Sequence, residues 1–124
     1  LPIVFICEDN DLSVLTKTED RRSWRAVDLA NSLNMYAVDI TDDPWLIAHH
    51  VRELKDNLPA VLNIRTCRML WHAGTGCDGD MEWNRFDLIK QAMGSIGLEM
   101  QTKEVESNTQ KAVKGLWEKQ LQML

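Results

Sequence analysis

Ile-Val-Phe-Ile-Cys, residues 3–7, is a continuous apolar run, and the turn-forming residues Asp9-Asn10-Asp11 follow it. A short run of this kind is typical of a strand buried on both faces, as in a parallel sheet. Further apolar runs occupy 35–40 and 60–67, and helical patterns occupy 23–33 and 44–57. This alternation predicts an α/β fold in three layers, with a mostly parallel sheet between flanking helices.

The rest of the chain predicts a loop and two helices. The loop, 69–82, holds three of the six glycines and has no regular apolar period. Helices are predicted over 83–96, ended by Gly97, and over 103–123. We expect Ser23 to cap the first helix, Asp42 or Asp43 to cap the second, and Trp24 and Trp117 to be in the core. The length of 124 residues suits a single domain over 1–124.

Composition narrows the function classes. The chain has a net charge of −5 and a pI near 5.1, so it lacks the basic surplus that nucleic acid or an anionic membrane surface requires. No apolar run is long enough for a transmembrane helix. Three cysteines cannot all pair, which suits a reducing compartment.

Polar residues follow two of the predicted strands, where ligands of parallel sheets usually bind. The sequence Glu8-Asp9-Asn10-Asp11 offers oxygen ligands for Mg²⁺, although a solvated acidic turn accounts for it equally well. A receiver domain of a signalling system would also have acids here, but it needs an aspartate at the end of the strand 60–67. Cys67, His72 and Cys77 suggest Zn²⁺, but a fourth ligand is missing at the usual spacing.

Two segments resemble the alpha subunits of thiamine diphosphate-dependent 2-oxoacid dehydrogenases, the family of the pyruvate, branched-chain and acetoin enzymes. Residues 1–14, with Leu-Pro, a buried strand and Cys-Glu-Asp-Asn-Asp, are similar to the second half of the family's cofactor motif. Residues 65–68, Arg-Thr-Cys-Arg, with His72 beyond them, are similar to the family's Arg-Thr-Tyr-Arg-x-x-Gly-His segment. Pro59 and the two C-terminal helices fall in matching places, so the resemblance covers nearly the whole chain.

The resemblance implies a cofactor site. Asn10 matches a side-chain ligand of the Mg²⁺ that bridges the diphosphate of thiamine diphosphate, and Leu12 matches a backbone-carbonyl ligand of the same ion. Arg68 matches an arginine that orders the loop of His72. His72 matches a catalytic histidine that reaches the cofactor and assists transfer to a lipoyl group. The implied substrate is a small 2-oxo acid.

The resemblance also implies partners and a compartment. The implied partners are a beta subunit, which completes a heterotetramer, and a lipoyl-bearing acyltransferase. The implied compartment is the cytoplasm or, in a eukaryote, the mitochondrial matrix. The family's loop has glycine where this chain has Trp71. The family's Gly-Asp-Gly half of the motif would precede Leu1, so we expect the chain to be the C-terminal part of a longer domain. A transketolase-like enzyme and a non-catalytic interaction domain remain as alternatives.

Overall fold

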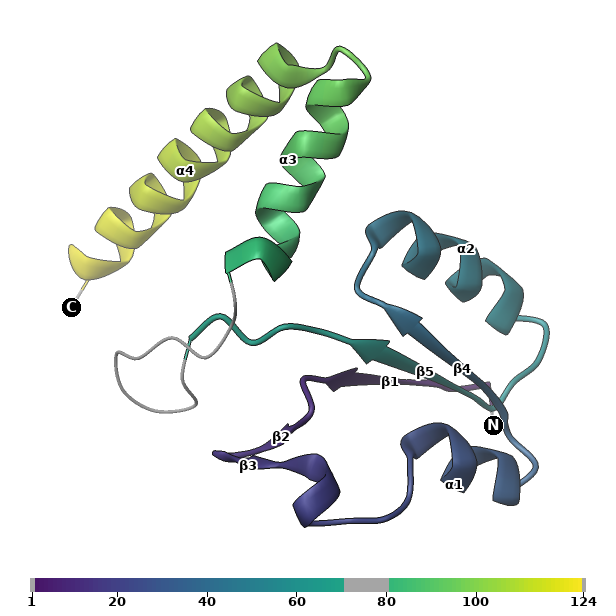
Figure 1. The fold of residues 1–124 in the computed structure, drawn as a ribbon. Coiled ribbons are helices and arrows are strands. Elements are labelled where there is room, and N and C mark those ends of the chain that lie inside the picture. The colour runs from purple at the N-terminus through teal and green to yellow at the C-terminus, as the bar shows by residue number, and fades with distance from the viewer. Residues whose placement is uncertain (1, 71–80, 124) are drawn as a thin grey trace. The chain divides into compact units, whose positions relative to one another are not determined.

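The computed structural model describes residues 2–70 and 81–123, and the chain divides into two compact units, Leu1–Arg85 and Phe86–Leu124. The first unit contains a parallel sheet with helices, and the second contains two helices (Figure 1). This confirms the predicted α/β class. The expectation of one domain over 1–124 is not tested by the division and stays a prediction.

The main sheet has three parallel strands in the order β1-β5-β4. Their bounds are Val4–Asp9 for β1, Tyr36–Thr41 for β4 and Ala60–Arg65 for β5. The connection after β1 leads to β4, two positions away in the sheet, and the connection after β4 leads back to β5, which lies between them. Right-handed crossovers in opposite directions place their helices on opposite faces, and α1 (Ala26–Ser32) and α2 (Pro44–Leu54) do lie on opposite faces (Figure 1).

The two faces of this sheet differ in polarity. Even-numbered residues of β4 and β5 point toward α2 and form the apolar core, because side chains alternate along a strand. That core consists of Ile40, Leu54, Ala60, Leu62 and Ile64, all buried. Odd-numbered residues point toward α1, and the register places Cys7, Asn63 and Asp39 in one row there. The hydrophobic core therefore lies mainly between the sheet and α2.

Asp42 and Asp43, which the sequence could not distinguish as the cap of the second helix, have different roles in the structure. Asp43 caps α2, because its Oδ1 accepts from the backbone N–H of Trp45 at 2.9 Å and of Leu46 at 3.1 Å. Asp42 instead pairs with Arg85, whose Nε donates to Asp42 Oδ1 at 2.8 Å. The prediction that Ser23 caps the first helix is wrong, since α1 begins after Arg25 and has no side-chain cap.

Two predictions of burial are also wrong. Among the described residues β1 pairs only with β5, and Phe5 and Ile6 are 51% and 58% exposed, so this strand is not buried on both faces. Trp24 is 52% exposed, because it precedes α1 and is not part of that helix's apolar face.

A short hairpin between β1 and α1 is not evident in the sequence. It comprises β2 (Leu12–Ser13) and β3 (Thr16–Lys17), and the 3-10 turn η1 (Thr18–Asp20) follows it. Its turn holds Val14 at a φ of 63°, a conformation that two-residue hairpin turns normally give to glycine, asparagine or aspartate. Because valine gives no such signal, sequence reasoning had no reason to place a hairpin here.

The second unit is built from two helices joined at Gly97. A 3-10 turn, η2 (Met81–Trp83), precedes α3 (Arg85–Ser95), and α4 covers Glu99–Leu121. Gly97 has a φ of 79°, and the N–H groups of Gly97 and Leu98 donate to the carbonyls of Gly94 and Met93. This is the expected glycine stop. Trp117 is 68% exposed, so the prediction of a core tryptophan is wrong.

Candidate functional site

The carboxyl edge of the parallel sheet carries two neighbouring clefts. The smaller one, about 290 Å³, is lined by the turn after β1 and is called here the Asn10 cleft. The larger one, about 610 Å³, is lined by the ends of all three strands and the segment before α1 and is called here the Asp39 cleft. Asp9, Thr18 and Arg22 line both clefts, so they form a common wall.

The turn after β1 brings together the two residues expected to bind a metal. The backbone N–H of Leu12 donates to Oδ1 of Asn10 at 3.1 Å, which closes an Asx turn. Leu12 lies opposite Lys17 in the hairpin, and the neighbouring backbone hydrogen bond runs from the N–H of Thr18 to the carbonyl of Asp11. In an antiparallel ladder every second residue pair makes no backbone hydrogen bond, and Leu12 belongs to such a pair, so its N–H and carbonyl point away from β3. Since the N–H and C=O of one strand residue project to the same side, the Leu12 carbonyl lies on the edge that faces Asn10.

The acidic run itself does not form a metal cluster. Asp9 accepts the backbone N–H of Asp11 at 3.0 Å and pairs with Arg22, whose Nη2 lies 3.6 Å from Asp9 Oδ2. Within 2–70 and 81–123, no group of three or more His, Cys, Asp or Glu side chains could hold a metal ion. An ion at this turn would therefore depend on the Asn10 and Leu12 oxygens and on ligands from outside these ranges.

Arg22 holds the common wall in place. Its Nη1 donates to the carbonyl of Trp24 at 3.0 Å, and its guanidinium lies 4.4 Å from the centre of the Trp24 ring. Together with the ion pair to Asp9, these contacts fix a long cationic side chain in one geometry. The Arg22 side chain is only 21% exposed, so its charge is partly shielded from water.

Cys7 lies beside this wall and also lines the Asn10 cleft. Burial raises the pKa of its thiol, the Asp9 carboxylate raises it further, and Arg22 lowers it. A raised pKa leaves the thiol protonated near neutral pH, and a protonated thiol is a poor nucleophile. Cys7 therefore lines the cleft as a neutral group.

Arg68 connects the end of β5 to the hairpin. Its Nη1 donates to the backbone carbonyl of Val14 at 2.8 Å, across 54 positions of sequence. This bond orders the turn between β2 and β3. The role that the resemblance implies for Arg68, ordering the loop of His72, stays a prediction. His72 lies outside the described residues, and so do Trp71 and Cys77.

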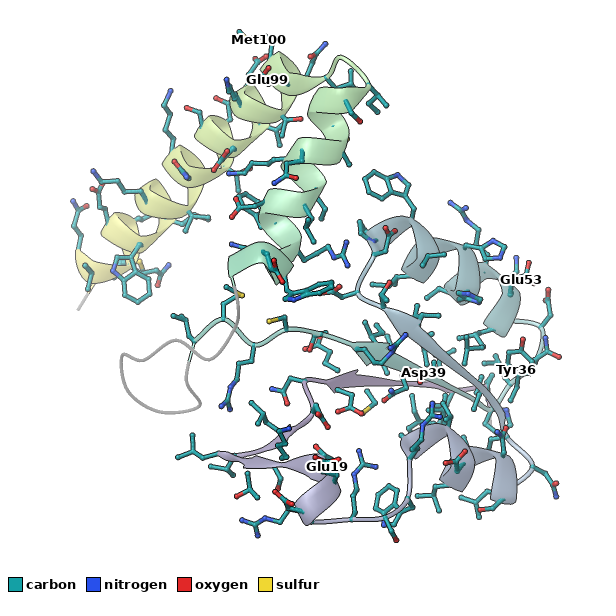
Figure 2. The ribbon with its side chains drawn as sticks, in the orientation of Figure 1. Glu19, Tyr36, Asp39, Glu53, Glu99 and Met100 are labelled. Atoms are coloured by element: carbon teal, nitrogen blue, oxygen red, sulfur yellow. The ribbon has the colours of Figure 1, made fainter. Side chains whose placement is uncertain are left out.

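The Asp39 cleft was missed by sequence reasoning. Asn63 and Asp39 lie inside runs that were interpreted as apolar strands, and they face each other across β5 and β4. The available signal was a polar residue in the middle of each run, because strands of a buried parallel sheet seldom carry one. Figure 2 labels Asp39 on β4 and Glu19 on η1, both of which line the cleft.

Comparisons with known proteins add no relative. A scan against models of protein families, a search of curated proteins and a search of solved structures each returned no match. What is shown is an α/β chain with a three-stranded parallel sheet flanked by helices. None of the described helices is long and apolar enough to cross a bilayer.

Proposed function

We propose that this chain forms the diphosphate- and Mg²⁺-holding side of a thiamine diphosphate-dependent 2-oxoacid dehydrogenase alpha subunit. The observation that supports this most directly is the turn at Asn10 and Leu12. A side-chain oxygen and a backbone carbonyl lie on the same edge of the chain, directly after a parallel strand. Ligands of such sheets bind at this edge.

The donor set suits the proposed ion. Mg²⁺ prefers oxygen ligands in octahedral geometry and often keeps water and substrate phosphate oxygens among them. Oδ1 of Asn10 has a second lone pair besides the one that accepts from Leu12, so it can bind an ion without opening the turn. The diphosphate, water and the carboxylate of the family's Gly-Asp-Gly step would supply the remaining ligands.

The bound cofactor would supply a carbanion that attacks a 2-oxo acid and stores charge after CO₂ leaves. This chain's residues would bind and orient. Asn10 and Leu12 would hold the ion, and Arg68 would keep the hairpin in place through Val14. His72 is proposed to exchange a proton during transfer to a lipoyl acceptor, since a histidine titrates near neutral pH.

The proposal includes the partners that the resemblance implies. A beta subunit would complete the site, and a lipoyl-bearing acyltransferase would take the product, in the cytoplasm or the mitochondrial matrix. A transketolase-like enzyme would use the same ion and cofactor on a sugar phosphate. An interaction domain would need neither.

The test is made on the natural gene product purified with its beta subunit. Binding of thiamine diphosphate is measured by calorimetry with and without Mg²⁺, together with CO₂ release from a panel of 2-oxo acids. We expect Asn10→Ala to lower cofactor affinity at least tenfold and to abolish CO₂ release. Leu12→Ala should leave both nearly unchanged, because its ligand is the backbone carbonyl.

The matched control is Asn57→Ala, which removes an exposed amide that lies beyond α2 and whose Nδ2 donates to the backbone carbonyl of Glu53. Thermal unfolding of each variant shows whether it is folded. Full CO₂ release by a folded Asn10→Ala enzyme would overturn the proposal. Cofactor binding with ketol transfer between sugar phosphates, and no CO₂ release, would favour the transketolase-like alternative.

His72 has a separate test. We expect His72→Ala to keep most CO₂ release with an artificial electron acceptor but to lose acyl transfer to a lipoyl acceptor. Equal loss of the two activities would contradict the proposed role, because it would place His72 in decarboxylation itself.

A further inference from the structure

The Asp39 cleft is lined by Asn63 and Asp39, two polar residues at positions where a parallel sheet is normally apolar. Asn63 is 5% exposed and lies in the central strand, between Cys7 and Asp39 in register. Buried polar groups persist where they are paired or where they serve a ligand, because an unpaired one costs free energy. The row therefore needs a reason beyond packing.

Asp39 is shared by more cationic groups than it can neutralise. Arg25 Nη2 lies 2.5 Å from Asp39 Oδ2, and Arg65 Nε lies 3.4 Å from Asp39 Oδ1. Two guanidinium groups thus face one carboxylate, and one positive charge is left over at this end of the cleft. Both arginine side chains are more than 60% exposed, so most of their N–H donors remain accessible.

The other acids of the cleft do not cancel this surplus locally. Asp9 already pairs with Arg22 in the common wall, and Glu19 pairs with Lys17, Nζ to Oε1 at 3.7 Å. Asp11 is exposed at the turn after β1, so its carboxylate is hydrated. The cleft therefore offers guanidinium N–H donors near Asp39 and the carboxylate of Asp11 at the turn after β1.

Asn63 adds an acceptor that lacks a donor. Its Nδ2 donates to Asp39 Oδ1 at 3.1 Å, which fixes the orientation of the amide. Its Oδ1 is the buried side-chain atom without a hydrogen-bond partner among the residues that the structure describes. An unsatisfied buried acceptor of this kind destabilises the fold, because it has lost its hydrogen bonds to water. Asn63 lines the cleft, but its Oδ1 has almost no accessible surface, so a ligand there can donate to this atom only when the side chains that cover it move aside.

We propose that the Asp39 cleft binds a small carboxylic acid that carries a hydrogen-bond donor on the neighbouring carbon, a 2-hydroxy or 2-amino acid. The carboxylate pairs with Arg25 and Arg65, and the hydroxyl or ammonium group donates to Oδ1 of Asn63. A volume of about 610 Å³ is ample for such a molecule. This site is separate from the Asn10 cleft and does not rest on the proposed cofactor.

Three acids of equal carbon number test the donor requirement on the full chain, without thiamine diphosphate or Mg²⁺. Propionate has no donor on carbon 2, lactate has a hydroxyl and alanine has an ammonium group. Affinities are measured by NMR titration of the backbone amides. We expect lactate or alanine to bind at least tenfold more tightly than propionate, with the largest shifts at Asn63 and Arg65. Equal affinities for the three acids, or no binding by any, would overturn the proposal.

Pyruvate separates this site from the proposed reaction. Its 2-oxo group cannot donate to Asn63, so it should bind here no better than propionate. Tighter binding of pyruvate than of lactate and alanine would overturn the proposed chemistry of the cleft and leave the cofactor proposal standing. Loss of cofactor binding in Asn10→Ala would have no bearing on the cleft.

Variants locate the contacts. Arg65→Gln should weaken binding of the preferred acid at least tenfold, whereas Arg52→Gln, an exposed change on α2, should not. Asn63→Leu should remove the preference over propionate. If Asn63→Leu does not fold, Arg65→Gln and the three acids still test whether the cleft binds such a ligand, because neither measurement uses that variant. Unchanged binding in Arg65→Gln would overturn the assignment.

Discussion

Asn63 and Asp39 are joined across neighbouring parallel strands, with Asn63 Nδ2 donating to Asp39 Oδ1 at 3.1 Å. The same carboxylate also pairs with Arg25 and Arg65. One acidic side chain thus connects β4, β5 and the segment before α1. This side of the sheet is organised by a polar network, while the α2 side is organised by apolar packing.

Removing that carboxylate should destabilise the fold. Asp39→Ala leaves the buried Nδ2 of Asn63 without its acceptor and removes the counter-charge of two arginines. We expect a loss of about 1–3 kcal/mol in the free energy of unfolding. Urea unfolding measures it, and Asp56→Ala, an exposed change after α2, serves as control and should stay within about 0.5 kcal/mol. Similar values for the two variants would contradict a structural role for Asp39.

Truncation on the opposite face should cost more. Leu54 has no exposed surface and packs with Leu62 and Ile64 against the sheet. Leu54→Ala should lower the free energy of unfolding by about 2–5 kcal/mol, because it removes transfer energy and leaves a cavity. Leu15→Ala makes the same chemical change at a side chain that is 67% exposed, so its urea midpoint should barely move. A small effect at Leu54 would mean that the core is placed wrongly.

The cap of α2 can be tested with three substitutions of one residue. Asp43 accepts from two backbone N–H groups at the start of the helix, ahead of Pro44. Asp43→Ala should cost about 0.5–2 kcal/mol, Asp43→Gly only a few tenths, and Asp43→Asn almost nothing, since asparagine is an equally good cap. Thermal unfolding ranks the variants. An Asn variant as unstable as the Ala variant would show that charge, and not capping, is what matters.

The thiol of Cys7 gives a pH-dependent prediction. Its pKa is raised above the ordinary value of 9.0, chiefly by burial and then by Asp9, while Arg22 lowers it. The folded state therefore keeps the proton where the unfolded state releases it, and stability should fall as pH rises from about 9 through the raised pKa. Alkylation of Cys7 by iodoacetamide, followed by mass spectrometry, should have its half-maximal rate above pH 9.0.

Substitutions at the two charged neighbours should shift this profile in opposite directions. Asp9→Asn removes a charge that raises the pKa, so the alkylation midpoint should move to lower pH. Arg22→Ala removes a charge that lowers it, so the midpoint should move to higher pH. Shifts in the same direction would contradict the assigned causes.

The sequence by itself determined the class of fold and the order of its main elements. The runs at 3–7, 35–40 and 60–67 became the three parallel strands, and every strand end lies within two residues of the expected one, because a short apolar run favours a strand. Gly97 ended α3 as expected, because a left-handed residue after a helix is a local requirement. The sequence also placed Asn10 and Leu12 next to a strand end.

Only the tertiary structure decided which residues meet. Strand order brings Asp39 to Asn63 across 24 positions of sequence, and Arg68 reaches Val14 across 54. It also gave Asp42 and Asp43 different partners and left Phe5 and Ile6 of β1 exposed, since pairing partners and neighbouring charges are set by contacts between distant segments. Local patterns state what each segment prefers. Burial, the sharing of one carboxylate by two arginines and the acceptor left without a donor arise only when those segments pack together.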